Sequence, residues 1–262
     1  MAVAAGPDDA DRPGPAEQVA RDIGRAVEAT ASDFLHVTTA PARLDARGAY
    51  RTLGFFDAAG IVYAYDDEIL DWVDRNREED LYDIVLEPGR HLEPVGLAGK
   101  TMKYYIGGAV ITYAVERDHL FPFFADMVRT FAITGLYKNA ANVVVGRARP
   151  FEKKGPYFFQ YDGGTSFPSG HSSNIFQLAT VISHHVGYKP VSVVVYALAA
   201  STALERLDSN SHWPSDVFIG AAFGTAVARS IVKRGEERRL ALSPASAPFS
   251  GAPGVAIRIS LE

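Results

Sequence analysis

Hydrophobic residues recur along most of this chain at the spacing of three and four positions that is typical of amphipathic helices. Near the start, Val19, Ile23 and Val27 follow this spacing, with acidic and arginine residues between them. Longer apolar segments follow at about residues 102–117, 121–145, 172–187, 190–204 and 215–233. Glycine, proline or charged residues interrupt these segments, and the middle of the chain lacks the alternation of strands. The pattern therefore predicts an all-α, single-domain helical bundle.

The two ends of the chain differ from the helical part in composition. Residues 1–16 are rich in Gly, Pro, Ala and Asp, which predicts a disordered N-terminal tail without a signal-peptide pattern. Residues 17–240 carry the helical pattern and form the expected domain. Residues 241–262 are expected to form a Pro/Gly/Ser-rich C-terminal tail, with a short strand where apolar residues alternate at 255–261.

The lengths of the apolar runs bear on a membrane location. The longest apolar run without a charge covers 15 residues, 190–204, and a spanning helix needs about 18 consecutive apolar residues. On this criterion the bundle is expected to be soluble rather than membrane-spanning, with at most a peripheral contact with a membrane surface.

Charge and composition exclude further classes of function. The chain carries 26 basic and 31 acidic residues, a net charge of −5, which argues against nucleic acid as a partner. It has no cysteine, so disulfides, thiolate metal sites and cysteine nucleophiles are excluded. Asp66 and the acidic residues that follow it are expected to cap a helix and form a solvated face.

Three short segments, at residues 142–150, 167–171 and 206–216, concentrate side chains that bind or transfer phosphate. In the second segment Pro168 favours a helix start, which would leave the backbone amides of Ser169, Gly170 and His171 free to bind an anion. Gly170 lets a phosphate approach the backbone closely, because it has no Cβ. His171 would stand beside the anion, where an imidazole can give up a proton.

The third segment places a second histidine at a helix start. Pro214 predicts that start, with His212 just before it and Asp216 in the first turn. A carboxylate on one ring nitrogen of His212 would fix the tautomer and make the other nitrogen a better nucleophile. The guanidinium of Arg206 suits phosphate oxygens.

Basic residues also surround the first segment. Residues 138–154 contain five basic side chains and one acidic one, on a chain that is acidic as a whole. Arg147 and Arg149 are expected to supply cations that draw in an anionic substrate.

The order and spacing of these segments resemble the type 2 phosphatidic acid phosphatase superfamily, which includes lipid phosphatases, bacterial acid phosphatases and vanadium haloperoxidases. Its signature reads Lys-x6-Arg-Pro, then Pro-Ser-Gly-His, then Ser-Arg-x5-His-x3-Asp. The chain matches it at Arg149 and Pro150, at residues 168–171, and at Arg206, His212 and Asp216.

The resemblance implies a helical bundle of this family's type and a metal-independent phosphatase. Its substrates would be phosphate monoesters or lipid phosphates and diphosphates, cleaved through a phosphohistidine intermediate. The implied roles are nucleophile for His212, acid and then base for His171, and orientation of His212 for Asp216. Arg149, Arg206, Ser169 and Gly170 would bind phosphate. No metal or other cofactor is expected, and vanadate would enter only as a phosphate mimic or in a haloperoxidase.

The chain departs from the signature at two positions. Asn142 stands where the family has lysine, and it can hydrogen-bond to phosphate but brings no charge. Lys138 lies one helical turn earlier on the same face, and we expect it to replace the missing cation. Glu205 stands where the family has a small residue, and an acid there could weaken anion binding.

Two alternative functions remain open at this point. One is a vanadium-dependent haloperoxidase-like oxidoreductase, and the other is a catalytically impaired protein that binds a phosphate ligand. The favoured interpretation is a soluble enzyme, exported to the periplasm with its signal removed. Its substrate is a phosphorylated small molecule or lipid, and the sequence does not define its oligomeric state.

Overall fold

The computed structural model describes residues 14–116 and 119–242. The predicted C-terminal strand and nearly all of both predicted tails lie outside these residues. Within them the chain forms nine α-helices and three short 3-10 helices, and the one isolated β-bridge joins Arg147 to Phe159. Apart from this bridge, the regular secondary structure of the described residues is thus helical.

The helices follow one another with short connections. In chain order they are α1 (Pro15–Thr38), η2 (Ala40–Arg43), α2 (Ala46–Ala64), α3 (Asp66–Asn76), α4 (Asp80–Leu92), η3 (Glu93–Gly96), α5 (Ala98–Ala114), α6 (Phe121–Val145), η4 (Pro150–Glu152), α7 (Gly170–Val186), α8 (Lys189–Asp208) and α9 (Pro214–Leu242). The longest connection described, residues 146–169 between α6 and α7, contains most of the first two segments that are predicted to bind phosphate.

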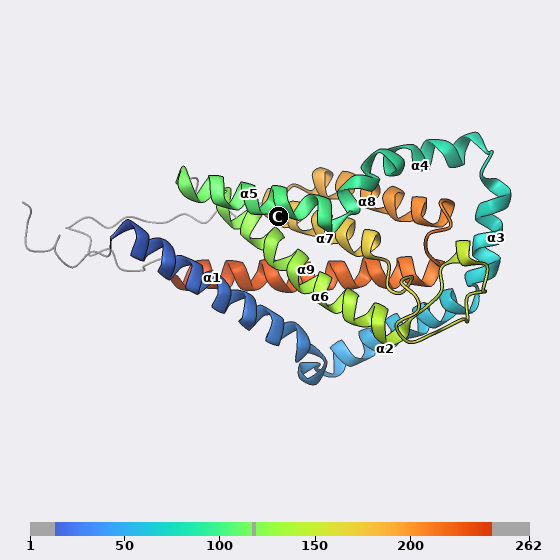
Figure 1. Ribbon diagram of the computed structural model, residues 1–262, viewed down its shortest axis with the longest axis horizontal. Coiled ribbons are helices and arrows are strands. Elements are labelled where there is room, and N and C mark those ends of the chain that lie inside the picture. Colours follow the sequence, from blue (N-terminus) through green and yellow to red (C-terminus); the bar gives the residue numbers. More distant parts are fainter. Residues whose placement is uncertain (1–13, 117–118, 243–262) are drawn as a thin grey trace, which may run out of the picture.

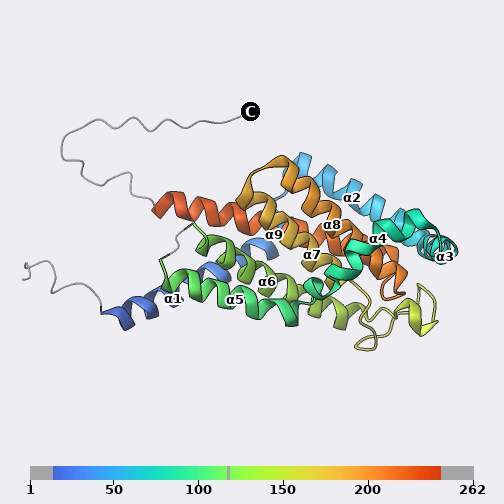
Figure 2. The same cartoon turned by 90° about the horizontal axis from the view of Figure 1, so that it is seen from above.

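Helices α6, α7, α8 and α9 run along the long axis of the molecule, and α3 lies across one end (Figures 1 and 2). The connection between α6 and α7 lies at this same end. Gly146 makes the turn out of α6, because its φ of +57° is left-handed and a Cβ there would lie 1.8 Å from the carbonyl oxygen of Gln160. The sharp turn at Gly146 leads α6 directly into the segment that carries Arg149.

The core consists of apolar side chains on the inward faces of the long helices. One cluster joins α6, α7 and α9 through Met127, Phe131, Val181, Ala228 and Val232. A second joins α3, α8 and α9 near the end of the bundle that holds the phosphate-binding segments, through Leu70, Val73, Ala203, Leu207, Trp213 and Val217. Together they hold in register the ends of the helices from which the site is built.

Glycines on α9 bring this helix unusually close to α7. A Cβ at Gly224 would lie 2.1 Å from the carbonyl oxygen of Ser173, and one at Gly220 would lie 2.6 Å from that of Ser169. Two glycines four positions apart thus form the contact face, as in closely packed helix pairs. The start of α7, where the Pro-Ser-Gly-His segment lies, is fixed against α9 by this contact.

The expectation of a bundle that is soluble rather than membrane-spanning is wrong. Two of the described helices are long and apolar enough to cross a bilayer: α8, with 20 residues and a mean hydropathy of 1.2, and the part Pro214–Arg239 of α9, with 26 residues and 1.3. Only 39% and 50% of these spans are buried. On α8 the side chains of Val193 and Val194 are 69% and 56% exposed, so its outward face is apolar.

Charged residues within or beside an apolar run do not by themselves prevent a helix from spanning a membrane. A spanning helix tolerates a few charges where they lie at its ends or are neutralised by a partner. Lys189 is the first residue of α8, and Glu205 near its other end pairs with Arg206. These charges therefore do not prevent α8 from crossing a bilayer.

Candidate active site

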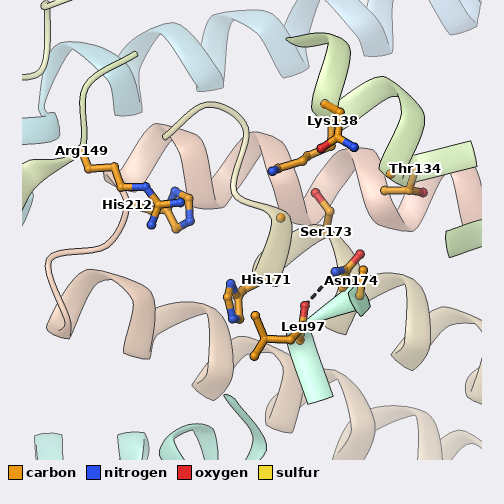
Figure 3. Close-up of a pocket in the computed structure, with 13 residues that line it drawn as sticks. Leu97, Thr134, Lys138, Arg149, His171, Ser173, Asn174 and His212 are labelled. Carbon is orange, nitrogen blue, oxygen red and sulfur yellow. Dashed lines mark hydrogen bonds between the residues drawn. The ribbon is translucent and has the colours of Figure 1, made fainter. Parts of the chain in front are cut away.

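A cavity of about 280 Å³ lies between the start of α5, the second half of α6 and the start of α7 (Figure 3). Five residues predicted from the sequence line it: Lys138, Arg149, Gly170, His171 and His212. Arg149 and His212 lie together on one side, while Lys138 and His171 approach the same space from other directions. The remaining lining residues are Gly96, Leu97, Ala98, Thr134, Gly135, Asn139, Ser173 and Asn174.

The ring of His212 is held in one tautomer. It is 2% exposed, and its Nδ1 donates to the carbonyl oxygen of Ser166 at 2.7 Å. A carbonyl can only accept, so Nδ1 carries the proton and Nε2 keeps its lone pair. Burial, assisted by the charge of Arg149, holds the pKa of His212 well below its usual value. The ring is therefore neutral near pH 7, as a nucleophile must be.

Asp216 acts on His212 through neighbouring groups rather than by direct contact. Its Oδ2 accepts from the hydroxyl of Ser166 at 2.5 Å and from the backbone N–H of Trp213 at 3.1 Å. Ser166 supplies the carbonyl that holds the ring, and Trp213 is the next residue in the chain. Asp216 thus holds both the residue whose carbonyl contacts the ring and the residue that follows His212 in the chain, whereas the sequence suggested a hydrogen bond to the imidazole itself.

Arg147 does not reach the cavity, and its expected role as a cation for the substrate is wrong. It is 1% exposed, and its guanidinium donates to Asp216 at 2.7 Å and to Asp66 at 2.6 Å. The rings of Tyr63, Phe159 and Trp213 surround it, with centroids 5.1 to 5.7 Å from its Cζ. The expectation for Asp66 is also wrong, because this carboxylate is fully buried and also accepts from the backbone N–H and the hydroxyl of Ser215.

The turn predicted to bind an anion lies at the start of α7, and it is shifted from the predicted position. The helix begins at Gly170 rather than at Pro168, and Ser169 is its N-cap. The Ser169 hydroxyl accepts from the Ser172 amide at 3.3 Å and its own N–H donates to the Asp216 carbonyl oxygen, so this buried residue serves the turn and does not line the cavity. The amides of Gly170 and His171 have no acceptor among residues 14–116 and 119–242, which leaves both available to an anion.

Lys138 and Asn142 meet one helical turn apart on α6. When the Asn142 amide is oriented so that its nitrogen donates to the carbonyl oxygen of Phe167 at 2.6 Å, its oxygen accepts from Lys138 Nζ at 2.6 Å. A Cβ at position 170 would lie 3.2 Å from Lys138 Cε, so the lysine stem runs against the anion-binding turn. Burial and the nearby Arg149 lower the pKa of Lys138 from its usual value.

The two arginines that are predicted to bind phosphate differ in how they are held. Arg149 lines the cavity, and its Nε donates to the hydroxyl of Thr165 at 3.0 Å. Arg206 is 7% exposed and does not line the cavity, because it pairs with Glu93 at 3.3 Å and with the adjacent Glu205. Its Nε is buried and has no partner in the described part of the chain.

His171 contacts a residue that no motif contains. Its Nε2 lies 3.0 Å from Oε1 of Glu93, which is 78 positions earlier and belongs to η3. Burial and the charge of Arg206 lower the pKa of His171 to about 4, and Glu93 opposes this shift. Sequence reasoning missed both Glu93 and Ser166, because neither stands at a recognisable spacing from the histidine it contacts.

The described residues hold no group of three or more His, Cys, Asp or Glu side chains that could bind a metal ion. The cavity instead collects cations, free backbone amides and two histidines. Such a set is suited to holding a phosphate group and exchanging one of its ester oxygens.

Part of the chain is similar in sequence to known proteins. Residues 123–239 match the family model of the PAP2 superfamily. Three similar curated proteins are each named lipid A 1-phosphatase. The protein from Porphyromonas gingivalis is 36% identical over 100 residues, 37% of this chain and 20% of that protein. The protein from Rhizobium etli is 32% identical over 106 residues, which is 38% of this chain and 45% of that protein. The protein from Rhizobium johnstonii is 33% identical over 101 residues, which is 36% of this chain and 41% of that protein.

These matches support the resemblance predicted from the three motifs: residues 123–239 of this chain are similar to the type 2 phosphatidic acid phosphatase (PAP2) superfamily. The matched stretches span less than half the length of the curated relatives. No solved structure matches the chain.

The comparisons also correct the expected location. The relatives are named for a lipid substrate, and α8 and α9 are long and apolar enough to span a bilayer. The expectation of a soluble protein that is not transmembrane is therefore wrong, whereas its export to the periplasm stays a prediction.

Proposed function

We propose that this protein is a lipid phosphatase that uses His212 as its nucleophile. The observation that carries the proposal is the state of His212: a neutral ring with a free Nε2, at the wall of a cavity that collects phosphate-binding groups. The names of the three relatives support hydrolysis of a phosphate ester. The roles below follow from the geometry of the cavity.

In the first step, Nε2 of His212 attacks phosphorus and the bond to the ester oxygen breaks. His171 delivers a proton to the departing oxygen, so the leaving group departs as a neutral alcohol. The negative charge of the bound phosphate opposes the nearby arginines and raises the pKa of His171, which allows the ring to carry this proton. The proton stays on Nδ1 of His212 and remains hydrogen-bonded to the Ser166 carbonyl oxygen. This hydrogen bond stabilises the positive charge that develops on the ring.

In the second step, water attacks the phosphohistidine from the side that the alcohol has left. His171 now takes a proton from that water as the N–P bond breaks, so His212 is restored and inorganic phosphate is released. Arg149 and the amides of Gly170 and His171 stabilise the charge on the equatorial oxygens. Lys138 adds the cation that Asn142 lacks, and Asn142 holds it in place. No step requires a metal or another cofactor.

A lipid ester is the substrate class that best fits the surroundings of the cavity. Leu97 and Ala98 line it at the start of α5, and the exposed side of this helix carries Ile106 and Val110 at 47% and 61% exposure. An apolar helix that begins at the phosphate site lets the acyl part of a substrate remain in a bilayer while its phosphate enters the cavity. The relatives named for lipid A support the same class.

The decisive test is phosphate release by the detergent-solubilised protein from lipid phosphates, a lipid diphosphate, lipid A and a small aryl phosphate. Each is assayed with and without EDTA, beside His212→Ala. We expect turnover that resists EDTA, is lost in His212→Ala, and is fastest on a lipid. Phosphate labelled in the substrate should become attached to the parent protein and not to His212→Ala, through a bond that is labile to acid and stable to base.

Three results would contradict the proposal, and each points to a different function. Turnover that requires a divalent metal, or that survives in His212→Ala, would exclude the histidine mechanism. Halide oxidation with vanadate and peroxide, without phosphate release, would indicate a haloperoxidase. Binding of a phosphate ligand without turnover would indicate a binding protein.

A further inference from the structure

The short helix η3, between α4 and α5, forms a support for the ring of His171. Glu93 at its start contacts Nε2 of the ring at 3.0 Å. Gly96 at its end lies so close that a Cβ there would be 2.8 Å from Cδ2 of the same ring. The Gly96 carbonyl oxygen in turn accepts from Nδ2 of Asn174, one turn along α7 from His171, at 2.7 Å. The position of the ring is thus fixed by the Glu93 carboxylate, by the close approach of Gly96, and by the hydrogen bond that ties its own helix to η3.

This support decides which nitrogen of His171 meets the substrate. Nε2 is occupied by the Glu93 carboxylate, so Nδ1 is the nitrogen that remains for the leaving group. Figure 3 shows the His171 ring between the start of α5 and the space that Arg149 and His212 approach. A carboxylate on one nitrogen orients an imidazole and stabilises its protonated form, while the other nitrogen exchanges the proton.

We propose that Glu93 is a positioning residue of the reaction: it aims Nδ1 of His171 at the leaving-group oxygen and stabilises the imidazolium that protonates it. The proposal rests on the function proposed above. In the first step, the proton moves from Nδ1 to the ester oxygen as the P–O bond breaks. In the second step, Nδ1 regains a proton from the attacking water. Glu93 keeps its charge throughout, and within residues 14–116 and 119–242 it forms ion pairs with His171 and Arg206 alone.

The charges around His171 make this role necessary. Arg206 on α8 and Arg149 in the connection before α7 both disfavour a positive ring, and His212 lies on the far side of the cavity. Glu205 faces Arg206 and not the histidine. In the described part of the chain, Glu93 is the one carboxylate within ion-pairing distance of the His171 ring. Burial and the arginines lower the pKa of this ring, and Glu93 opposes them.

Two substrates with different leaving groups separate a role in proton transfer from a general effect. An alkyl or lipid phosphate releases a strongly basic alkoxide and needs protonation, whereas p-nitrophenyl phosphate releases a weakly basic phenolate and needs little. We expect Glu93→Gln to lower kcat for the lipid phosphate at least about tenfold more than for the aryl phosphate, out of the roughly 10²–10⁴-fold that a general acid contributes. The alkaline limb of the kcat profile should shift to lower pH by about one unit, with KM changed less than about threefold.

Matched variants make the result specific. Glu205→Gln removes the other carboxylate from Arg206 but none from His171, so it should affect both substrates alike and leave the alkaline limb in place. Glu93→Asp should recover part of the lipid phosphate activity. In a His171→Asn background, Glu93→Gln should cost less than about twofold, because the two residues act as one unit.

Three results would overturn the proposal. They are an equal fall in kcat for both substrates in Glu93→Gln, an alkaline limb of its kcat profile that coincides with that of the parent, and the same fold loss of kcat when Glu93→Gln is made in the His171→Asn background. If the Glu93→Gln protein fails to fold, Glu93→Asp decides by the same criteria, alone and in the His171→Asn background. If the parent hydrolyses the substrates but the alkaline limb of Glu93→Gln does not shift, only the role of Glu93 is rejected. A parent without any hydrolysis would reject the proposed function as well.

Discussion

Arg147 and Arg149 are two positions apart in the sequence, and the structure gives them separable roles. Arg147 is 1% exposed and bridges two fully buried carboxylates, Asp66 and Asp216. Arg149 lines the cavity, and within the described residues its guanidinium hydrogen-bonds to Thr165 alone. We therefore predict that Arg147→Met destabilises the fold, whereas Arg149→Met abolishes most of the activity and leaves the fold intact.

The magnitude follows from what each change leaves behind. Methionine at 147 leaves two buried carboxylates without their counter-charge, which typically costs about 3–5 kcal/mol in the free energy of unfolding. For a protein of this size about 1 kcal/mol lowers the Tm by 2–4 °C, so the expected fall is about 6–20 °C. Methionine at 149 loses the bonds to Thr165, about 1 kcal/mol each. It should lower kcat/KM by about 10²–10³, the usual cost of one transition-state donor.

Tryptophan fluorescence provides a local assay for this pair. The chain has two tryptophans, and a Trp72→Phe background leaves Trp213 alone, with its ring 5.5 Å from the Arg147 guanidinium and 3% exposed. Thermal unfolding of each variant in detergent is followed by this signal, and phosphate release is measured on the same samples. An Arg147→Met protein as stable as the parent would refute the assignment, and so would an Arg149→Met protein that loses as much Tm as Arg147→Met.

Three further predictions test the site and its support. Lys138→Ala should lower kcat/KM by about 10- to 100-fold through loss of a charged donor to phosphate, and unchanged constants would show that this lysine does not replace the missing cation. Because burial lowers the pKa of His171 to about 4, the native ring stays neutral between pH 6.5 and 4 while the unfolded ring takes up a proton. The parent should therefore lose up to about 3 kcal/mol of stability over that interval relative to His171→Asn, and parallel pH profiles of Tm would contradict this. Gly224→Ala should cost about 1–3 kcal/mol, since its Cβ would meet the Ser173 carbonyl at 2.1 Å, whereas Gly107→Ala, in open space, should cost nothing in the same Tm measurement.

Much of the helical framework could be predicted from local pattern. The segment predicted at 121–145 is α6 with the same limits, and those near 172–187 and 190–204 correspond to α7 and α8. Helices α2 and α4 were not predicted. α4 contains Pro88 and Gly89, which argue locally against a helix, but Gly89 is needed because a Cβ there would lie 2.4 Å from the carbonyl oxygen of Ser201.

The number of consecutive apolar residues does not by itself decide whether a helix can span a membrane. Whether a charge prevents a helix from spanning depends on its partner, and the pairing of Glu205 with Arg206 or of Asp216 with Arg147 is a property of the folded protein. In the same way, Arg147 and Arg149 are equally basic as residues. They differ only because one points into the packing of α3 against α9 and the other into the cavity.

The residues alone indicate the family resemblance, the helical class and the proposed phosphate chemistry, because these depend on side-chain types at fixed spacing within single segments. The tertiary structure decided which basic side chains reach the cavity and that Asp216 acts on His212 through Ser166. It also placed Glu93 on His171 across 78 positions. These contacts join helices far apart in the chain, and such proximity arises from packing and leaves no periodic mark in the sequence.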